Sequence, residues 1–134
     1  MRAAFRYLTS VLFLAIVAQV GLAGYGAFDA IHKAKHVSVT KKTIEHGFDA
    51  HAALGGIIVA LLLLAFVLAG AGRMGRPWVP WAGGLLVAGV AQWVLGTASA
   101  DVPWLGFFHG IVALAIYAGV ALLAHRAWTQ ARTA

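Results

Sequence analysis

Two histidines, His51 and His109, lie inside long apolar stretches of this 134-residue sequence. A polar ring is costly to expose to lipid, so a histidine in a membrane-spanning segment usually faces the interior of a helix bundle and a partner there. Both histidines lie near the ends of their segments that we place on the same side of the bilayer. Two imidazoles at matched depth could hold one metal centre. We expect a b-type haem, because haem iron commonly takes axial histidine.

Glycines accompany both histidines. Two of them stand four residues before and after His51, which places them on its face of a helix, and the sequence around His109 is also rich in glycine. Small residues leave a shallow groove in which a flat macrocycle could approach the backbone. We therefore predict a haem site with His51 and His109 as the metal ligands and with space provided by four glycines, Gly47, Gly55, Gly106 and Gly110.

The same residues also have a purely structural interpretation. Gly106 and Gly110 form a spacing that packs helices together, and glycine is frequent in membrane helices generally. A histidine in a bundle can simply hydrogen-bond a neighbouring helix, here at Gln19 or Gln92. Proton relay and a non-haem metal are further alternatives. In this interpretation the protein is a cofactor-free accessory membrane subunit or a small transporter.

Three more histidines lie near the connection between the first two apolar stretches. His32 and His36 are four residues apart and share a face if the first helix extends outward, and with His46 and a nearby carboxylate they could bind zinc or copper. We favour a solvated loop, because four nearby lysines repel a cation. Those lysines could instead meet haem propionates, anionic lipid headgroups or an acidic partner.

The composition is that of a membrane protein. Hydrophobic residues make up 62% of the chain and charged residues 10%, against about 45–50% and 25% in soluble domains. The chain has no cysteine, which excludes disulfides, thiolate metal sites and thiol catalysis. The net charge of +6 comes from basic residues that flank apolar runs, so we expect no nucleic-acid partner. The sequence names neither a substrate nor an enzymatic reaction.

Four stretches reach the roughly 20 residues that a helix needs to cross a bilayer. Glycines and Pro77 interrupt the chain between the second and third, and Pro103 suits the first turn of the fourth. Nothing alternates like the strands of a barrel. We see no internal repeat. We predict an all-α, four-helix transmembrane bundle with up-down-up-down topology, one domain over residues 1–134, and spans at about 7–28, 47–71, 78–98 and 103–124.

Charge favours an orientation with both termini in the cytoplasm. The side of the N-terminus would carry six arginines and no acid, and the opposite side four lysines and all four acids, which agrees with the positive-inside rule. Tryptophans fall near both interfaces, as an aromatic belt requires. The arginines are Arg2, Arg6, Arg73, Arg76, Arg126 and Arg132, and the opposite residues are Lys33, Lys35, Lys41, Lys42, Asp29, Glu45, Asp49 and Asp101.

The first span has features of a cleavable signal peptide. Arg2 and Arg6 precede an apolar run and the small-residue sequence Gly21-Leu22-Ala23. The run continues to Phe28, which is longer than a typical signal core, so we expect the segment to be retained. A cleaved form would keep three spans.

Several short motifs resemble a small four-helix integral membrane family of unknown function from high-GC bacteria. They are Arg6-Tyr7, Gln19-Val20-Gly21-Leu22-Ala23-Gly24, residues 48–51 and His109-Gly110. The likeness covers nearly the whole chain and implies a multi-pass protein of the bacterial inner membrane. It implies little chemistry.

A more distant likeness is to one four-helix half of haem A synthase, in which the second and fourth helices offer histidines to haem. His51 and His109 match those helix positions. Glu45 and His46 match that family's acid-and-histidine motif only loosely, with different spacing, so its oxidative reaction is not implied. One haem near one face suits electron exchange with a quinone, an exterior donor or a redox partner protein. A homo-oligomer is also compatible with the sequence.

Overall fold

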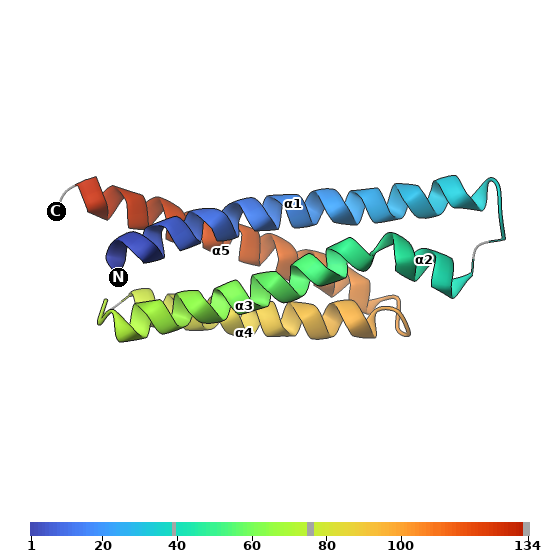
Figure 1. Ribbon diagram of the computed structural model, residues 1–134. Helices are drawn as coiled ribbons and strands as arrows, with labels where there is room; N and C mark the ends of the chain where they lie inside the picture. Colours follow the sequence, from blue (N-terminus) through green and yellow to red (C-terminus); the bar gives the residue numbers. More distant parts are fainter. Residues whose placement is uncertain (39, 75–76, 133–134) are drawn as a thin grey trace.

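The computed structural model describes residues 1–38, 40–74 and 77–132. In these residues the regular elements are helices, and no strand occurs. The long helices α1, α3, α4 and α5 lie roughly along one axis and alternate in direction, and the short helix α2 lies at one end of the bundle (Figure 1). The predicted all-α bundle is therefore confirmed. The helices are α1 (Arg2–Ala34), α2 (Lys41–Gly47), α3 (Asp49–Ala71), α4 (Trp78–Ala98) and α5 (Leu105–Arg132).

The four long helices are long and apolar enough to cross a membrane. Their outward-facing side chains are also apolar: Leu14, Val87 and Leu114 are each at least 64% exposed. A helix that is hydrophobic on all sides needs an apolar environment around the bundle as well as inside it. The chain is therefore a multi-pass membrane protein.

The long helices pack in a closed ring. Helix α1 contacts α3 and α5, and α4 contacts the same two helices. Helices α1 and α4 are therefore diagonal to each other, and so are α3 and α5. A group shared by α3 and α5 must lie on the central axis of the bundle.

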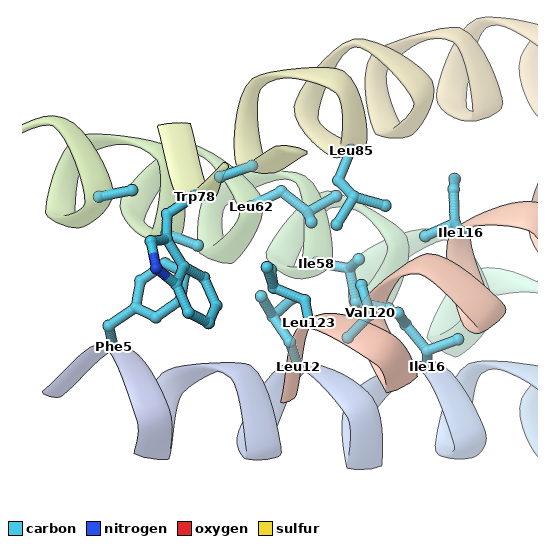
Figure 2. Close-up of a cluster of buried hydrophobic side chains, with 13 residues drawn as sticks. Phe5, Leu12, Ile16, Ile58, Leu62, Trp78, Leu85, Ile116, Val120 and Leu123 are labelled. Carbon is cyan, nitrogen blue, oxygen red and sulfur yellow. The ribbon is translucent and has the colours of Figure 1, made fainter. Parts of the chain in front are cut away.

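All four long helices contribute to the apolar core, whose buried side chains are drawn in Figure 2. This core occupies one half of the length of the bundle, the half that contains the chain termini. Beyond the level of Ile16, Ile58, Gly89 and Ile116, the only buried residues among those described are two glycines, Gly26 and Gly47. We call this second part the histidine half, because it contains His51 and His109. The core side chains of the terminal half are Phe5, Leu12, Ile16, Ile58, Leu62, Ala65, Ala69, Trp78, Ala82, Leu85, Ile116, Val120 and Leu123.

Helix α1 extends beyond the predicted 7–28 at both ends. Its last turns continue through polar residues, where Lys33 Nζ lies 2.6 Å from Asp29 Oδ2, one turn earlier. The segment 29–46, which the sequence predicts as a solvated loop between the first two spans, is therefore helical for most of its length. Much of the remainder forms α2, whose first turn is capped by the Thr40 side chain accepting from Thr43 N at 3.2 Å.

The other helix ends also differ from the predicted spans. Helix α3 begins at Asp49 rather than Gly47, because Phe48 leaves the helical conformation and separates α2 from α3. Pro103 lies in a turn and accepts from Gly106 N at 3.0 Å, so α5 begins at Leu105 and then continues past residue 124. Hydropathy predicts which residues prefer lipid, whereas backbone hydrogen bonds decide where a helix ends.

The connection between α3 and α4 begins with a left-handed residue. Arg73 has φ 47°, and its N–H bonds Gly70 O at 3.0 Å while Met74 N bonds Ala69 O at 3.1 Å. These bonds satisfy the last carbonyls of α3, as helix-ending motifs generally do. Arginine therefore takes the position that glycine usually fills. Gly75 and Arg76 of the predicted connection lie outside the described residues.

Candidate functional site

One polar residue from each long helix lies at the same level of the histidine half. These are Gln19 of α1, His51 of α3, Gln92 of α4 and His109 of α5, which we call the polar layer. The two imidazole rings lie 6.3 Å apart between centroids, with their planes at 59°. Because α3 and α5 are diagonal helices, the rings meet across the central axis of the bundle.

The first pair in this layer joins α1 to α3. His51 Nδ1 lies 3.1 Å from the main-chain oxygen of Gln19, and Gln19 Nε2 donates to the main-chain oxygen of His51 at 2.8 Å. The side chain of each residue therefore hydrogen-bonds the main-chain oxygen of the other. The Phe48 ring also meets the His51 ring edge to face, at 6.1 Å between centroids.

The second pair joins α4 to α5 by the histidine bond alone. His109 Nδ1 lies 3.0 Å from the main-chain oxygen of Gln92. A carbonyl oxygen can only accept, so in both pairs the proton belongs on Nδ1 and the neutral ring keeps its lone pair on Nε2. Metal-binding histidines usually have this arrangement, with one nitrogen donating to a backbone carbonyl and the other free for the metal.

The ring separation is compatible with a shared metal ion. Two imidazoles on opposite sides of one metal, with metal–nitrogen bonds of about 2.0–2.1 Å, place their ring centres about 6–6.6 Å apart. The observed 6.3 Å lies in that range. Direct ring contact gives a similar separation, so the distance permits a metal without requiring one.

The His109 ring packs directly against Gly96, where a larger residue would not fit. A Cβ at this position would lie 2.9 Å from His109 Cε1 and 3.1 Å from Nδ1. Gly96 is not among the glycines predicted from the sequence, although its spacing of one helical turn from Gln92 is a usable signal. Gly55 has a milder version of this role, because its Cβ would lie 3.2 Å from Gln19 Nε2.

The other predicted glycines have different surroundings. A Cβ on Gly47 would lie 3.1 Å from Asp29 Oδ2 and 3.3 Å from the Gly26 oxygen, so Gly47 allows α1 to approach the junction of α2 and α3. Gly106 and Gly110 are open: the nearest atom to the first is Ser99 Cβ at 3.9 Å, and nothing lies within 4 Å of the second.

Two buried acceptors in the polar layer have no hydrogen-bond partner. They are Oε1 of Gln19 and Oε1 of Gln92. A buried oxygen without a donor is costly, and most buried polar atoms in native proteins are satisfied. Together with the two Nε2 lone pairs, these oxygens leave the layer with unused capacity to bind a further group.

The polar layer also shows that the chain contains a structural repeat, which the sequence analysis did not detect. Core and layer residues recur at identical spacing in α1 and α4, and again in α3 and α5. Five of the ten matching pairs are identical residues, and the other five pairs differ in side chain. On α1, Phe5, Thr9, Leu12, Ile16 and Gln19 correspond to Trp78, Ala82, Leu85, Gly89 and Gln92 on α4. On α3, His51, Ile58, Leu62, Ala65 and Ala69 correspond to His109, Ile116, Val120, Leu123 and Ala127 on α5.

The bundle therefore consists of two similar hairpins, α1–α3 and α4–α5. Their correspondence and the ring-like packing of the helices describe an approximate twofold axis along the bundle. Membrane proteins built from parallel repeats commonly place their sites at the interface between the repeats. His51 and His109 are the matching residues that face each other across this axis.

The outer histidines do not form a comparable site. The His32 and His36 rings lie 5.1 Å apart, whereas His46 Nδ1 lies 2.7 Å from Asp49 Oδ2, and both of these side chains are exposed. Within the described part of the chain, no three His, Cys, Asp or Glu side chains form a group that could hold a metal ion. A two-histidine site with haem needs only the pair in the polar layer.

Comparisons with known proteins assign no family or function to the chain. No protein-family model, no curated protein and no solved structure matches the chain. The ring separation in the polar layer is compatible with a metal or haem between two imidazoles, and its hydrogen bonds join α1 to α3 and α4 to α5 without any further group.

Proposed function

We propose that the protein is a membrane-embedded b-type haem protein for electron transfer, with a single bis-histidine haem in the histidine half. The observation that supports this proposal is the polar layer. It presents two imidazoles on diagonal helices, each held through Nδ1 by a main-chain oxygen, with 6.3 Å between ring centroids.

The residues of the histidine half fit such a group. His51 and His109 would hold the haem iron, and the carbonyl bonds of the polar layer orient both rings and leave Nε2 available. Gly96 gives the His109 ring its seat, and the open Gly106 and Gly110 leave space beside α5. The absence of large buried side chains in the described residues of this half also favours a flat macrocycle there. When bound, the haem iron supplies one-electron redox chemistry.

The surroundings of the site define how electrons could be exchanged. Apolar helices surround the partly buried imidazoles, and the layer lies near only one end of the bundle. One haem near one face suits a quinone or a redox partner protein at that face and does not span the bilayer electrically. We place the protein in the bacterial inner membrane with both termini in the cytoplasm, as the arginine distribution favours. Reporter fusions at the two termini test this orientation.

A visible spectrum tests the haem itself. The protein, purified in mild detergent from haem-replete cells, should show a Soret band and, after dithionite, sharp α and β bands of a low-spin haem. The double variant His51→Ala, His109→Ala should lose the haem, whereas the control His32→Ala, His36→Ala should keep it. A colourless wild-type protein, or unchanged haem content in the first variant, would contradict the proposal.

A cofactor-free accessory subunit or small transporter is the second candidate. It is favoured by the reciprocal bonds between Gln19 and His51, which join α1 to α3 without any additional group. If the histidines only pack, the pure protein is colourless and His51→Gln, a hydrogen-bonding substitute, preserves its thermal stability. In the haem protein the same substitution removes a ligand and changes the spectrum.

A further inference from the structure

The two hairpins differ in chemistry on one outer face of the terminal half. On α1–α3 this face carries four aliphatic side chains. The matching positions of α4–α5 hold an aromatic ring, two glycines and a cation, so a feature exists there that the first hairpin lacks. Trp81, Gly84, Gly119 and Arg126 correspond to Leu8, Val11, Leu61 and Leu68.

These substitutions produce a shallow apolar groove between α4 and α5. Its volume is about 290 Å³, and its lining residues are Pro80, Trp81, Gly84, Leu85 and Gly119. Trp81 Nε1 donates to the main-chain oxygen of Gly119 at 3.3 Å, which ties the two helices together. Nothing lies within 4 Å of a Cβ built on Gly84, so the groove is open where the other hairpin carries Val11.

A cation lies at one end of this groove. The Arg126 guanidinium is 4.9 Å from the centroid of the Trp81 ring. The four acidic residues of the chain all lie at the opposite end of the bundle, and no acidic side chain pairs with Arg126 in the described residues. Tryptophan and arginine at the end of a span are typical of the bilayer surface, where lipid phosphates are the available anions.

We propose that this groove binds one anionic phospholipid, with an acyl chain along Gly84 and Gly119 and the phosphate on Arg126. Charge complementarity favours a lipid over a second copy of the chain. A second copy in the same orientation would bring its own arginine-rich end, which has no acid, against Arg126. The proposal is independent of the haem, because the groove lies in the terminal half.

Native mass spectrometry of the detergent-purified protein titrated with phosphatidylglycerol or phosphatidylcholine tests this site. One cation near the membrane surface contributes about 1 kcal/mol, so we expect about fivefold stronger retention of phosphatidylglycerol. Arg126→Gln should remove that preference, and Gly84→Leu should fill the groove and reduce the retention of both lipids. Matched controls are Arg2→Gln at the same end and Val11→Leu on the other hairpin, which should bind as the wild type does.

Four results would overturn the proposal. Equal retention of both lipids by the wild type, or no effect of Arg126→Gln, would show that no phosphate site exists. A wild-type dimer that Gly84→Leu converts to a monomer would make this face a contact between copies. Gly84→Ala fills less of the groove and replaces the leucine variant if that variant does not fold. Undiminished retention of phosphatidylglycerol by every folded groove variant would also reject the site.

Discussion

Both hairpins contain the same pair of a glutamine and a histidine, but the neighbouring contacts that hold the pair differ. In both, a histidine near the start of the second helix donates through Nδ1 to the main-chain oxygen of a glutamine on the first. The α1–α3 hairpin adds a return bond from the glutamine side chain, whereas the α4–α5 hairpin adds a glycine, Gly96, under the histidine ring. The two hairpins therefore share the hydrogen bond that orients the imidazole, and they differ in the second contact that holds it in place.

The connections differ as well. The first hairpin joins its helices through α2 and a close approach of Gly26 to Gly47, while the second uses the short turn 99–104. The first hairpin therefore depends on backbone contact near the histidine, and the second on space around the ring. A substitution that removes the backbone contact should destabilise the first hairpin, and one that fills the space beside the ring should destabilise the second.

The largest effect is expected where the backbones approach most closely. A Cβ on Gly26 would lie 2.9 Å from the Gly47 oxygen and 2.9 Å from Phe48 Cδ1. Gly26→Val should push α1 away from the α2–α3 junction and lower the free energy of unfolding by about 2–3 kcal/mol. Thermal unfolding in detergent, followed by circular dichroism, measures this loss. Gly24→Val is the control, because nothing lies within 4 Å of its Cβ, and equal losses in the two variants would refute the close contact.

The second effect concerns the seat of the His109 ring. Gly96→Ala places a Cβ 2.9 Å from His109 Cε1, so the ring must move, at a cost of about 1–2 kcal/mol. If haem is bound, its content should fall too. The control Gly110→Ala has open space and should be neutral or stabilising by up to about 1 kcal/mol, since alanine favours helix over glycine. Unchanged stability and haem content in Gly96→Ala would show that the ring does not need this space.

A smaller effect separates the two glutamines. Gln19→Leu removes the bond to the His51 oxygen and should cost about 0.5–1.5 kcal/mol. Gln92→Leu removes a buried oxygen that has no partner and should be neutral or slightly stabilising, because an unsatisfied acceptor is lost. Unfolding measurements on the two single variants test this difference. A greater loss from Gln92→Leu would mean that its side chain serves a bound group, and adding haem should then change the ranking.

The smallest effect is expected on the outer face of α4–α5. Trp81→Phe removes the 3.3 Å bond to the Gly119 oxygen but keeps an aromatic ring beside Arg126. We expect a loss of about 0.5 kcal/mol or less, visible as a small shift in melting temperature. The control is Leu8→Ile, a conservative change at the matching position of the other hairpin, which removes no hydrogen bond. A loss of several times that size would assign the Trp81 bond a main role in joining α4 to α5.

Much of the fold follows from local properties of the sequence. Four apolar stretches of sufficient length predict four membrane helices, because both hydropathy and helix length are read along the chain. Pairing of His51 with His109 follows from their matched depth in alternating helices. The sequence also indicated Gln19 and Gln92 as neighbours of the histidines. It did not show that the acceptors are their main-chain oxygens, because that depends on how closely the helices pack.

Other features depend on which helices meet. The role of Gly96 depends on the approach of the His109 ring from another helix, and Gly47 faces Gly26 because α1 continues far enough to reach it. The structural repeat is only partly visible in the sequence, since five of its ten matching pairs differ in residue type and share only their place in the bundle.

The sequence by itself thus determined a four-helix membrane protein with two histidines at one level, since periodicity and hydropathy are local. Only the tertiary structure decided that the histidines lie on diagonal helices, face each other across an approximate twofold axis and keep Nε2 free. Those properties arise from contacts between residues far apart in the chain, where close approach of backbones selects glycine and a carbonyl oxygen selects the tautomer.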